Sequence, residues 1–419
     1  MEAAGLLVLI FTMLVLRQNV VLLLLATAAY THLVWGDGLL IYLIEDLWIS
    51  LDNEVLLAIP LFIMAGNVMT RGSIARRLID ITRLVTNPLP GGLGVATILS
   101  CALFAAISGS SPVTLLAIGT ILYPALINEG YSRNFSLGAL TAGGTLGIVI
   151  PPSIPMILYG LVTEKSISDL FVAGIIPGLM ITLALAMYSL WVNRHLPAKP
   201  WQPKELLVAL RDGIWSLMLP VILLGGIYSG YFSPTEAAAV ALAYGLLVEI
   251  FIHRELGFKD YYQTAEETAK LLGMLFPIIA VALSLKTILT IEQIPQNLAL
   301  WVSSSVESKI AFLLAVNVLL LFVGCLFDVV SAILVLAPLL LGIAQLYGID
   351  PIHFGVIMVI NLEIGFLTPP IGLNLIVAMT AFKQSFGRIC AAVIPFVIII
   401  LGVLLLITFI PELTLFLVG

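Results

Sequence analysis

The sequence predicts an all-α integral membrane protein built from two similar halves, each with a helical hairpin and a helix broken by consecutive prolines. Hydrophobic residues make up 61% of the 419 residues, charged residues only 10%, and the mean hydropathy is +1.16. Because a membrane-spanning helix needs about 20 apolar residues, the chain has room for roughly ten to twelve spans, some of them re-entrant. The composition therefore predicts many membrane crossings.

Positive side chains are concentrated in three connections between apolar segments. These connections are residues 71–83, 194–211 and 254–270. By the positive-inside rule they are expected to face the cytoplasm. So few charges give no indication of a nucleic-acid partner, and the net charge of −6 says less than the distribution of the charges.

The apolar run 360–378 contains a break that we interpret as a site. Pro369 and Pro370 have no N–H, so the carbonyls of Gly365 and Phe366 are expected to lose their helical donors. Thr368, which precedes a proline, is disfavoured in the α conformation. Unpaired carbonyls are costly in hydrocarbon, so such a break persists only where protein or a cavity satisfies it.

A second break has the same pattern, because a glycine again stands four residues before a Pro-Pro pair within residues 143–160. Gly130 precedes Pro151 by 21 residues, and Gly348 precedes Pro369 by 21 residues as well. Interrupted apolar segments at corresponding positions of two halves indicate the midplane binding site of a secondary transporter. Two unrelated proline kinks are the alternative, but the matching register argues against it.

The N-terminal region, residues 1–90, is predicted to contain scaffold helices. Residues 4–35 form one long or two short apolar segments. Arg17 interrupts them, and it lies either at a helix end, where it can reach water, or at a functional position inside the membrane. We expect a polar connection over 36–51, a span over 56–70 and an arginine-rich loop over 71–90.

The first transport repeat is predicted over residues 91–192. Apolar residues 92–107 and 115–127 flank a cluster of small and hydroxyl residues at 108–114, which predicts a hairpin that enters and leaves on one side. A packing face of small residues is the alternative. The first broken helix and a plain span over 171–192 follow.

The rest of the chain divides into a linker with scaffold helices, a second transport repeat and a last membrane segment. Ser233 to Glu236 form a capping box with proline at the first helical position, a structural helix start. The linker and its scaffold helices are predicted over 193–307, with a polar linker at 193–211 and spans at 214–227, 235–251 and 271–289. The second transport repeat is predicted over 308–388 and the last membrane segment over 389–419.

Asp328 lies between two long apolar runs and is the carboxylate that the sequence places deepest in the membrane. An unpaired carboxylate there needs a cation, a proton or a hydrogen-bond donor. A structural hydrogen bond to the hairpin backbone is an equal alternative. We expect Asp328→Ala to impair transport without preventing assembly.

Broken helices offer two kinds of ligand. A half-helix N-terminus presents N–H groups that suit a carboxylate, whereas freed carbonyls and hydroxyls suit a hard cation such as sodium. Gly147 and Gly365 each precede a proline by four residues and have no side chain to shield the carbonyl. Thr368, Ser108 and Ser110 can add hydroxyl or carbonyl oxygens.

At these motifs the chain resembles the large membrane subunit, the DctM type, of TRAP transporters, the tripartite ATP-independent periplasmic transporters of bacteria. The resemblance covers nearly the whole chain, and its motifs lie at residues 57–66, 108–112, 144–155, 234–237 and 365–372. It implies an inverted-repeat, elevator-type fold in the bacterial inner membrane. It also implies sodium-driven uptake of an organic acid, a carboxylate, which a periplasmic substrate-binding protein delivers. A small four-helix membrane subunit is expected as a separate partner chain.

The resemblance also implies site residues. One sodium site falls on Ser108, Ser110, Gly147, Ile150 and Pro152, and a second on Gly324, Gly365, Thr368 and Ile371. Most of these residues would act through backbone carbonyls, and the family often has Asn where Ser110 stands. The candidate substrate contacts are Ser111, Thr145, Asn361, Asn374 and Asp328. Asn361 and Asn374 could instead order the loop.

Three other classes of protein compete with this interpretation. A stand-alone anion or sodium exchanger of the same superfamily would need no binding protein, and a channel would not show saturable uptake. An intramembrane enzyme would need a cluster of metal ligands, or a nucleophile and a base. The histidines are scattered and the cysteines lie in apolar sequence without pairing or metal spacing, so we expect no enzyme. The organic acid (a C4-dicarboxylate, a sialic acid, a keto acid or another) is left open.

Overall fold

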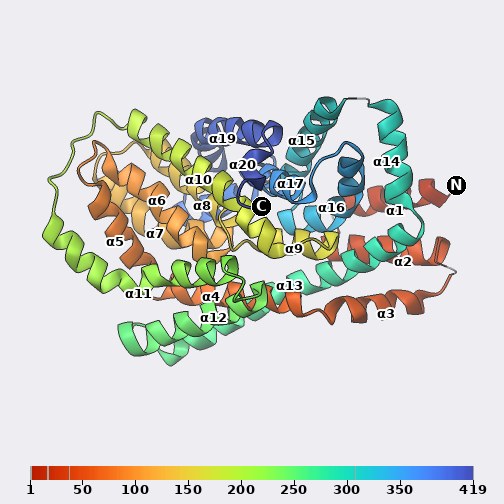
Figure 1. The fold of residues 1–419 in the computed structure, drawn as a ribbon, viewed down its shortest axis with the longest axis horizontal. Helices are drawn as coiled ribbons and strands as arrows, with labels where there is room; N and C mark the ends of the chain where they lie inside the picture. Colours follow the sequence, from red (N-terminus) through yellow and green to blue (C-terminus); the bar gives the residue numbers. More distant parts are fainter. Residues whose placement is uncertain (1, 17, 37, 307, 419) are drawn as a thin grey trace.

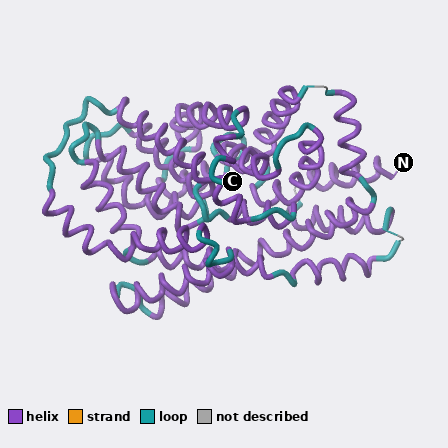
Figure 2. The backbone as a smooth tube through the Cα atoms, viewed as in Figure 1, coloured by secondary structure: helices purple, strands orange, loops and turns teal. Residues whose placement is uncertain are grey.

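The computed structural model describes residues 2–16, 18–36, 38–306 and 308–418. The part described consists of helices joined by short loops, and it contains no strand (Figure 2). Within it, 10 helical segments are long and apolar enough to span a membrane. The predicted all-α membrane architecture is therefore confirmed. Arg17, which the sequence singled out, lies outside the described residues.

The N-terminal region contains two helices that the sequence did not predict. Its elements are α1 (Glu2–Val15), α2 (Val20–Val34), α3 (Leu40–Leu51), the short 3-10 helix η1 (Glu54–Leu57), α4 (Ala58–Arg71) and α5 (Ile74–Thr86). The expected polar connection at 36–51 holds α3, and the expected loop at 71–90 holds α5, so both expectations were wrong. In α5, Ile74, Leu78 and Ile81 are buried at helical spacing, while Arg76 is exposed.

Each half contains a hairpin followed by a broken helix, as predicted. The first half has α6 (Gly92–Ser108), α7 (Ser111–Asn128), α8 (Arg133–Val149), α9 (Ile154–Thr163) and α10 (Ile167–Val192). The second has α15 (Lys309–Leu326), α16 (Val329–Leu346), α17 (Pro351–Phe366), α18 (Leu373–Phe382), α19 (Phe386–Phe409) and the short α20 (Glu412–Leu415). The order of elements is the same in both.

Between the halves lie α11 (Pro203–Tyr228), α12 (Pro234–Leu247) with its π-helical end η2 (Val248–His253), α13 (Phe258–Ile291) and α14 (Ile294–Ser305). The linker is shorter than predicted, because α11 begins at Pro203 and not after 211. The capping box is confirmed: Ser233 Oγ accepts from Glu236 N at 3.2 Å, and Ser233 N donates to Glu236 Oε2 at 2.8 Å.

The long helix α13 runs along one side of the molecule beside α3 and α4 (Figure 1). A buried polar cluster ties it to α2 and α3. The Ser284 hydroxyl donates to Asp46 Oδ2 at 3.2 Å and lies 3.0 Å from His32 Nε2. α8 and α17 lie at the centre, where Phe135 to Val149 and Ile352 to Phe366 are buried throughout.

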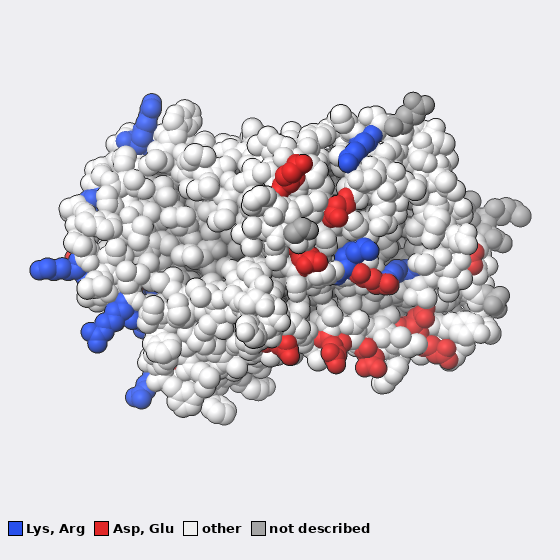
Figure 3. All heavy atoms as spheres, in the orientation of Figure 1, with Lys and Arg blue, Asp and Glu red and all other residues white. Residues whose placement is uncertain are grey.

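Most lysine and arginine side chains in view lie at one end of the molecule, whereas most acidic side chains, together with a few basic ones, lie toward the other (Figure 3). Three contacts bring the basic connections together at that end. Arg77 donates to Asp212 O at 3.2 Å and pairs with Glu255 at 3.5 Å, and Lys199 N donates to Asn87 O at 2.8 Å. The shared position agrees with the expectation that all three connections face the same side of the membrane.

Candidate functional site

Each broken helix meets the hairpin of its own half through a backbone hydrogen bond. In the first half, Ile154 N donates to Gly109 O at 3.4 Å, and in the second, Ile371 N donates to Cys325 O at 3.3 Å. Both Pro-Pro peptide bonds are cis. Both breaks therefore contact the hairpin of their own half through the backbone.

The first predicted sodium set comes together around the tip of the α6–α7 hairpin. Ser108 Oγ lies 2.6 Å from Thr114 Oγ1 and 3.4 Å from Ser110 O. A methyl group on Gly147 would overlap the Ser110 carbonyl group, so the two backbones are in contact. Because residue 151 is a proline, Gly147 O has no helical donor four residues on. Thr114, which the sequence analysis did not include, completes this oxygen-rich tip.

Two other members of this set are placed by glycines. Gly109 has a positive φ of 61°, and a Cβ there would lie 3.0 Å from Pro152 O, so this carbonyl faces the tip. The side chain of Ile150 packs against Gly178 of α10. Ile150 can therefore contribute only backbone atoms to the hairpin tip.

The second predicted set is built on a close glycine contact. A Cβ on Gly365 would overlap the backbone of Gly324, and a Cβ on Gly324 would lie 2.9 Å from Leu362 O. The expectation that the Gly365 carbonyl is left free by the prolines was wrong. Gly365 O accepts a hydrogen bond from Thr368 N at 3.0 Å, because the last turn tightens before the prolines. The Thr368 hydroxyl donates to Ile364 O at 2.8 Å.

The two breaks differ in exposure. Pro151 and Pro152 are buried, whereas Pro369 and Pro370 are exposed and Ile371 is 46% exposed. In the second predicted set, Gly324 and Gly365 are buried and only Ile371 is exposed. No member of the first predicted set is exposed.

Asp328 forms the N-cap of α16. Its Oδ1 accepts from Ser331 N at 3.0 Å and its Oδ2 accepts from Ser331 Oγ at 2.5 Å. It is only half-buried, whereas Glu249 is 0% and Glu363 is 2% exposed, so Asp328 is not the most buried carboxylate of the described residues. For the Asp328 carboxylate, the sequence left open a functional partner or a structural hydrogen bond to the hairpin backbone. The structure shows the hydrogen bond, to Ser331 N.

This cap gives a specific prediction. Asp328→Ala removes the acceptor for Ser331 N and should cost about 0.5–2 kcal/mol of stability. Asp328→Asn keeps an acceptor and should cost less. Thermal unfolding of the purified variants in detergent measures the difference. If both variants unfold at the wild-type temperature, the cap does not stabilise the hairpin.

The remaining candidate substrate contacts do not form one cluster. Asn374 Nδ2 donates to Ser111 Oγ at 2.5 Å, which joins α18 to α7. Asn361 Nδ2 instead donates to Asn317 Oδ1 at 2.6 Å, which joins α17 to α15. Thr145 Oγ1 donates within its own helix to Ala142 O at 2.5 Å. Only Ser111 and Asn374 are brought together.

The sequence analysis missed Glu363 as a candidate. It lies two residues before Gly365 and is only 2% exposed. The signal was present, because Glu363 is the acidic residue of an otherwise apolar run. An ionisable residue inside a membrane segment is a functional candidate by default.

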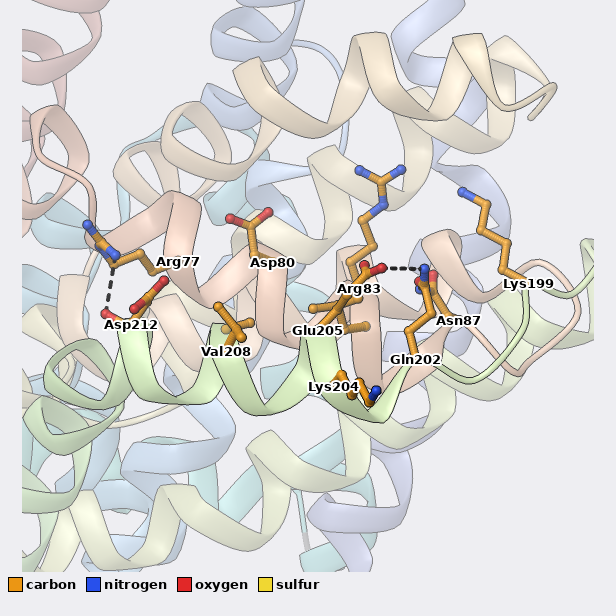
Figure 4. Close-up of a pocket in the computed structure, with 12 residues that line it drawn as sticks. Arg77, Asp80, Arg83, Asn87, Lys199, Gln202, Lys204, Glu205, Val208 and Asp212 are labelled. Carbon is orange, nitrogen blue, oxygen red and sulfur yellow. Dashed lines mark hydrogen bonds between the residues drawn. The ribbon is translucent and has the colours of Figure 1, made fainter.

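A pocket of about 680 Å³ lies at the basic end between α5 and the start of α11 (Figure 4). Asn87 Nδ2 donates to Gln202 Oε1 at 3.2 Å along its wall. Burial raises the pKa of Asp80 here, and Arg83 opposes that shift. None of the residues predicted to bind sodium or substrate lines this pocket.

A second pocket, of about 440 Å³, separates α13 and α14 from α9 and α16. Lys286 of α13 pairs across it with Glu164 at the end of α9, with 2.7 Å between Nζ and Oε1. This hydrogen bond holds the pKa of Glu164 below its usual range. The ion pair links the predicted scaffold to the predicted first transport repeat.

The fold and the paired breaks define a class of protein: a multi-pass membrane transport protein with two helical hairpins and two interrupted helices. A family model described as "Tripartite ATP-independent periplasmic transporter, DctM component" matches residues 7–413. The chain belongs to this family, and it is a multi-pass protein of the bacterial inner membrane.

Named relatives are similar over most of the chain. The C4-dicarboxylate TRAP transporter large permease protein DctM of Pseudomonas aeruginosa is 43% identical, over 93% of this chain and 92% of that protein. The 2,3-diketo-L-gulonate TRAP transporter large permease protein YiaN of Escherichia coli is 36% identical, over 86% of each. The isethionate TRAP transporter permease protein DctMQ of Oleidesulfovibrio alaskensis is 41% identical over 90% of this chain, which spans 60% of that longer protein.

Among solved structures, the YdaH transporter of Alcanivorax borkumensis has a similar fold. Its TM-score is 0.66 at 17% sequence identity, with 90% of this chain and 89% of that chain covered. At this identity the likeness concerns the fold alone.

Proposed function

We propose that this chain is the membrane subunit that carries an organic acid into the cell, driven by a sodium gradient and supplied by a periplasmic substrate-binding protein. In the proposed cycle the two hairpins and two broken helices move together against the scaffold helices, as in an elevator. A small four-helix membrane subunit completes the complex. The proposed coupling ions are two or more Na⁺.

The arrangement of the breaks carries this proposal. Each break places backbone carbonyls beside the tip of a hairpin, through Ile154 N to Gly109 O and Ile371 N to Cys325 O. Neutral oxygens in a dehydrated site suit sodium, and half-helix N-termini suit a carboxylate. No nucleotide-binding motif of the Gly-x-x-x-x-Gly-Lys-Ser/Thr type occurs in the sequence.

The available energy is sufficient for such a carrier. Moving one elementary charge across 100 mV is worth about 2.3 kcal/mol. If two net charges enter per cycle, the membrane potential supplies about 4–5 kcal/mol, which is enough for about a thousand-fold accumulation.

The names of relatives support a small organic acid as the substrate class. Those relatives are named for C4-dicarboxylates, isethionate and 2,3-diketo-L-gulonate, and two are named for ectoine. All of these contain a carboxylate or sulfonate group. We propose a carboxylate for this chain.

Uptake should require both sodium and the binding protein. The test uses proteoliposomes with this chain and its small subunit, a labelled organic acid, and independent control of the sodium gradient and the binding protein. We expect uptake to fall to background when choline replaces sodium or when the binding protein is left out.

Two results would contradict the proposal. Uptake that is indifferent to the binding protein would identify a stand-alone exchanger of the same superfamily. Uptake that is indifferent to sodium would remove the ion sites assigned at the two breaks.

A further inference from the structure

The pocket of about 680 Å³ between α5 and the start of α11 lies beside exposed apolar side chains. Val208 lines the pocket and is 59% exposed, and its neighbours Trp201 and Leu207 are 52% and 70% exposed. α11 itself is long and apolar enough to span a membrane. Tryptophan beside charged groups is typical of the boundary between membrane and water. We therefore place the pocket at the membrane surface.

The walls of this pocket carry charges of both signs. Four basic and three acidic side chains are among the residues that line it. A ligand that is only an anion, such as inorganic phosphate, would be repelled by the three carboxylates, and a ligand that is only a cation would be repelled by the basic groups. The lining therefore favours a ligand that itself carries one charge of each sign.

A positive charge is in excess at one side of the pocket. Arg83 Nη2 and Lys199 Nζ donate to the same oxygen, Glu129 Oε1, at 2.8 Å and 2.6 Å. One carboxylate thus serves two cations. A guanidinium has five N–H donors and an ammonium has three, so both cations keep donors for a further acceptor. This side of the pocket suits a phosphate group.

A carboxylate without a partner lies one helical turn from Arg83. Asp80 precedes Arg83 by three residues on α5, so the two side chains are neighbours on the helix surface. Asp80 makes no hydrogen bond or ion pair with any described residue. Figure 4 shows Asp80, Arg83 and Lys199 directed to the same side, away from α11. An ammonium group can therefore pair with Asp80 while a phosphate on the same ligand contacts Arg83 and Lys199.

We propose that this pocket binds the headgroup of a phosphatidylethanolamine molecule from the membrane leaflet at the basic end of the protein. The phosphate contacts Arg83 and Lys199, and the ammonium group donates to the Asp80 carboxylate. An acyl chain leaves the pocket over Val208 and continues along Trp215, which lies about two turns further on the same side of α11 and is 44% exposed. A zwitterionic headgroup on an apolar chain matches both the charges of the pocket and its place at the membrane.

The bound lipid joins parts of the chain that are far apart in sequence. Asp80 and Arg83 belong to α5, Val208 belongs to α11, and Lys199 lies in the linker between α10 and α11. Glu129, which the two cations share, is the C-cap of α7 in the first half. A ligand that binds only the folded state stabilises it. Phosphatidylethanolamine should therefore raise the unfolding temperature of the protein.

Lipid titration of the delipidated full chain in detergent, followed by native mass spectrometry, tests the site. The probes are phosphatidylethanolamine, phosphatidylcholine and phosphatidylglycerol with identical acyl chains. Phosphatidylcholine keeps the positive charge but has no N–H donor, and phosphatidylglycerol has no positive charge. We expect the first phosphatidylethanolamine to bind about tenfold more tightly than either, because each of the others lacks the hydrogen bond to Asp80. Equal affinities, or tighter binding of phosphatidylglycerol, would overturn the proposal without the use of any variant.

Three variants assign the two ends of the headgroup. Asp80→Asn should abolish the preference for phosphatidylethanolamine over phosphatidylcholine, and Arg83→Gln should weaken the binding of all three lipids. Lys270→Gln is the matched control, because Lys270 pairs with Glu266 at 2.6 Å on α13, outside the pocket, and it should behave as the wild type. A preference that survives in Asp80→Asn, or an unchanged affinity in Arg83→Gln, would contradict the assignment.

Glycerophosphoethanolamine, the headgroup without acyl chains, separates a lipid site from a site for a soluble ligand. We expect it to compete with the lipid only at concentrations far above that of the lipid. Competition at equal concentration would identify a soluble ligand and overturn the lipid assignment. None of these measurements involves transport, and none of the lipid contacts is a predicted sodium or substrate contact. The lipid site and sodium-coupled uptake can therefore be rejected separately.

Discussion

Gly365→Ala is expected to lower sodium-driven uptake by about 5- to 150-fold. The added methyl group would overlap the backbone of Gly324, and backbone on both sides leaves no flexible side chain to move aside. Overpacking of this kind typically costs about 1–3 kcal/mol. If that strain falls on the ion-binding geometry, it corresponds to about a 5- to 150-fold loss of affinity.

Gly342→Ala is the matched control for this prediction. Gly342 lies in α16, and no heavy atom lies within 4 Å of a Cβ built there. The control should therefore keep wild-type uptake, and it should gain stability by about 0.5–1 kcal/mol because alanine favours a helix. Equal uptake by Gly365→Ala and Gly342→Ala would show that the contact between Gly324 and Gly365 is not required.

Glu249→Leu is expected to destabilise the protein by about 2–6 kcal/mol. Glu249 Oε1 accepts from the backbone N–H groups of Ser73 and Ile74 at the start of α5, and the carboxylate is completely buried. Each buried donor left without an acceptor costs about 1–3 kcal/mol. Thermal unfolding, monitored as the loss of monodisperse protein on size exclusion, measures the effect.

Glu249→Gln separates hydrogen bonding from packing in this test. Glutamine has nearly the same shape and keeps one oxygen acceptor, so this variant should lie much closer to the wild type. If glutamine and leucine destabilise equally, the negative charge at the helix N-terminus matters more than the acceptor.

The parts of the fold that were predicted correctly depend on local chemistry. A proline removes an N–H wherever it stands, so the two breaks and the hairpins before them could be located from sequence. The helices α3 and α5 could not be recognised as easily. In α5, three arginines interrupt the apolar residues, and the helical spacing of Ile74, Leu78 and Ile81 reveals the buried face.

The errors at the site have a common cause, which is that depth and partners depend on tertiary structure. Asp328 and Glu363 both lie in apolar sequence, but the first caps a helix near the surface and the second is enclosed. Asn361 is close in sequence to the second break, yet its side chain is held by Asn317 of another helix. Sequence position cannot distinguish these cases, and the sodium assignments themselves stay predictions.

The ion pair between Lys286 and Glu164 has a consequence for the rate and balance of the proposed cycle. If α9 moves past α13, this contact breaks once in every turnover. Glu164 is 80% exposed, and an exposed pair contributes about 0.2–1 kcal/mol. That is enough to change the population of the conformation in which the contact is formed by up to about fivefold. It is too little to trap the carrier in that conformation. The pair would therefore set the resting population of the carrier, and ionic strength would tune it.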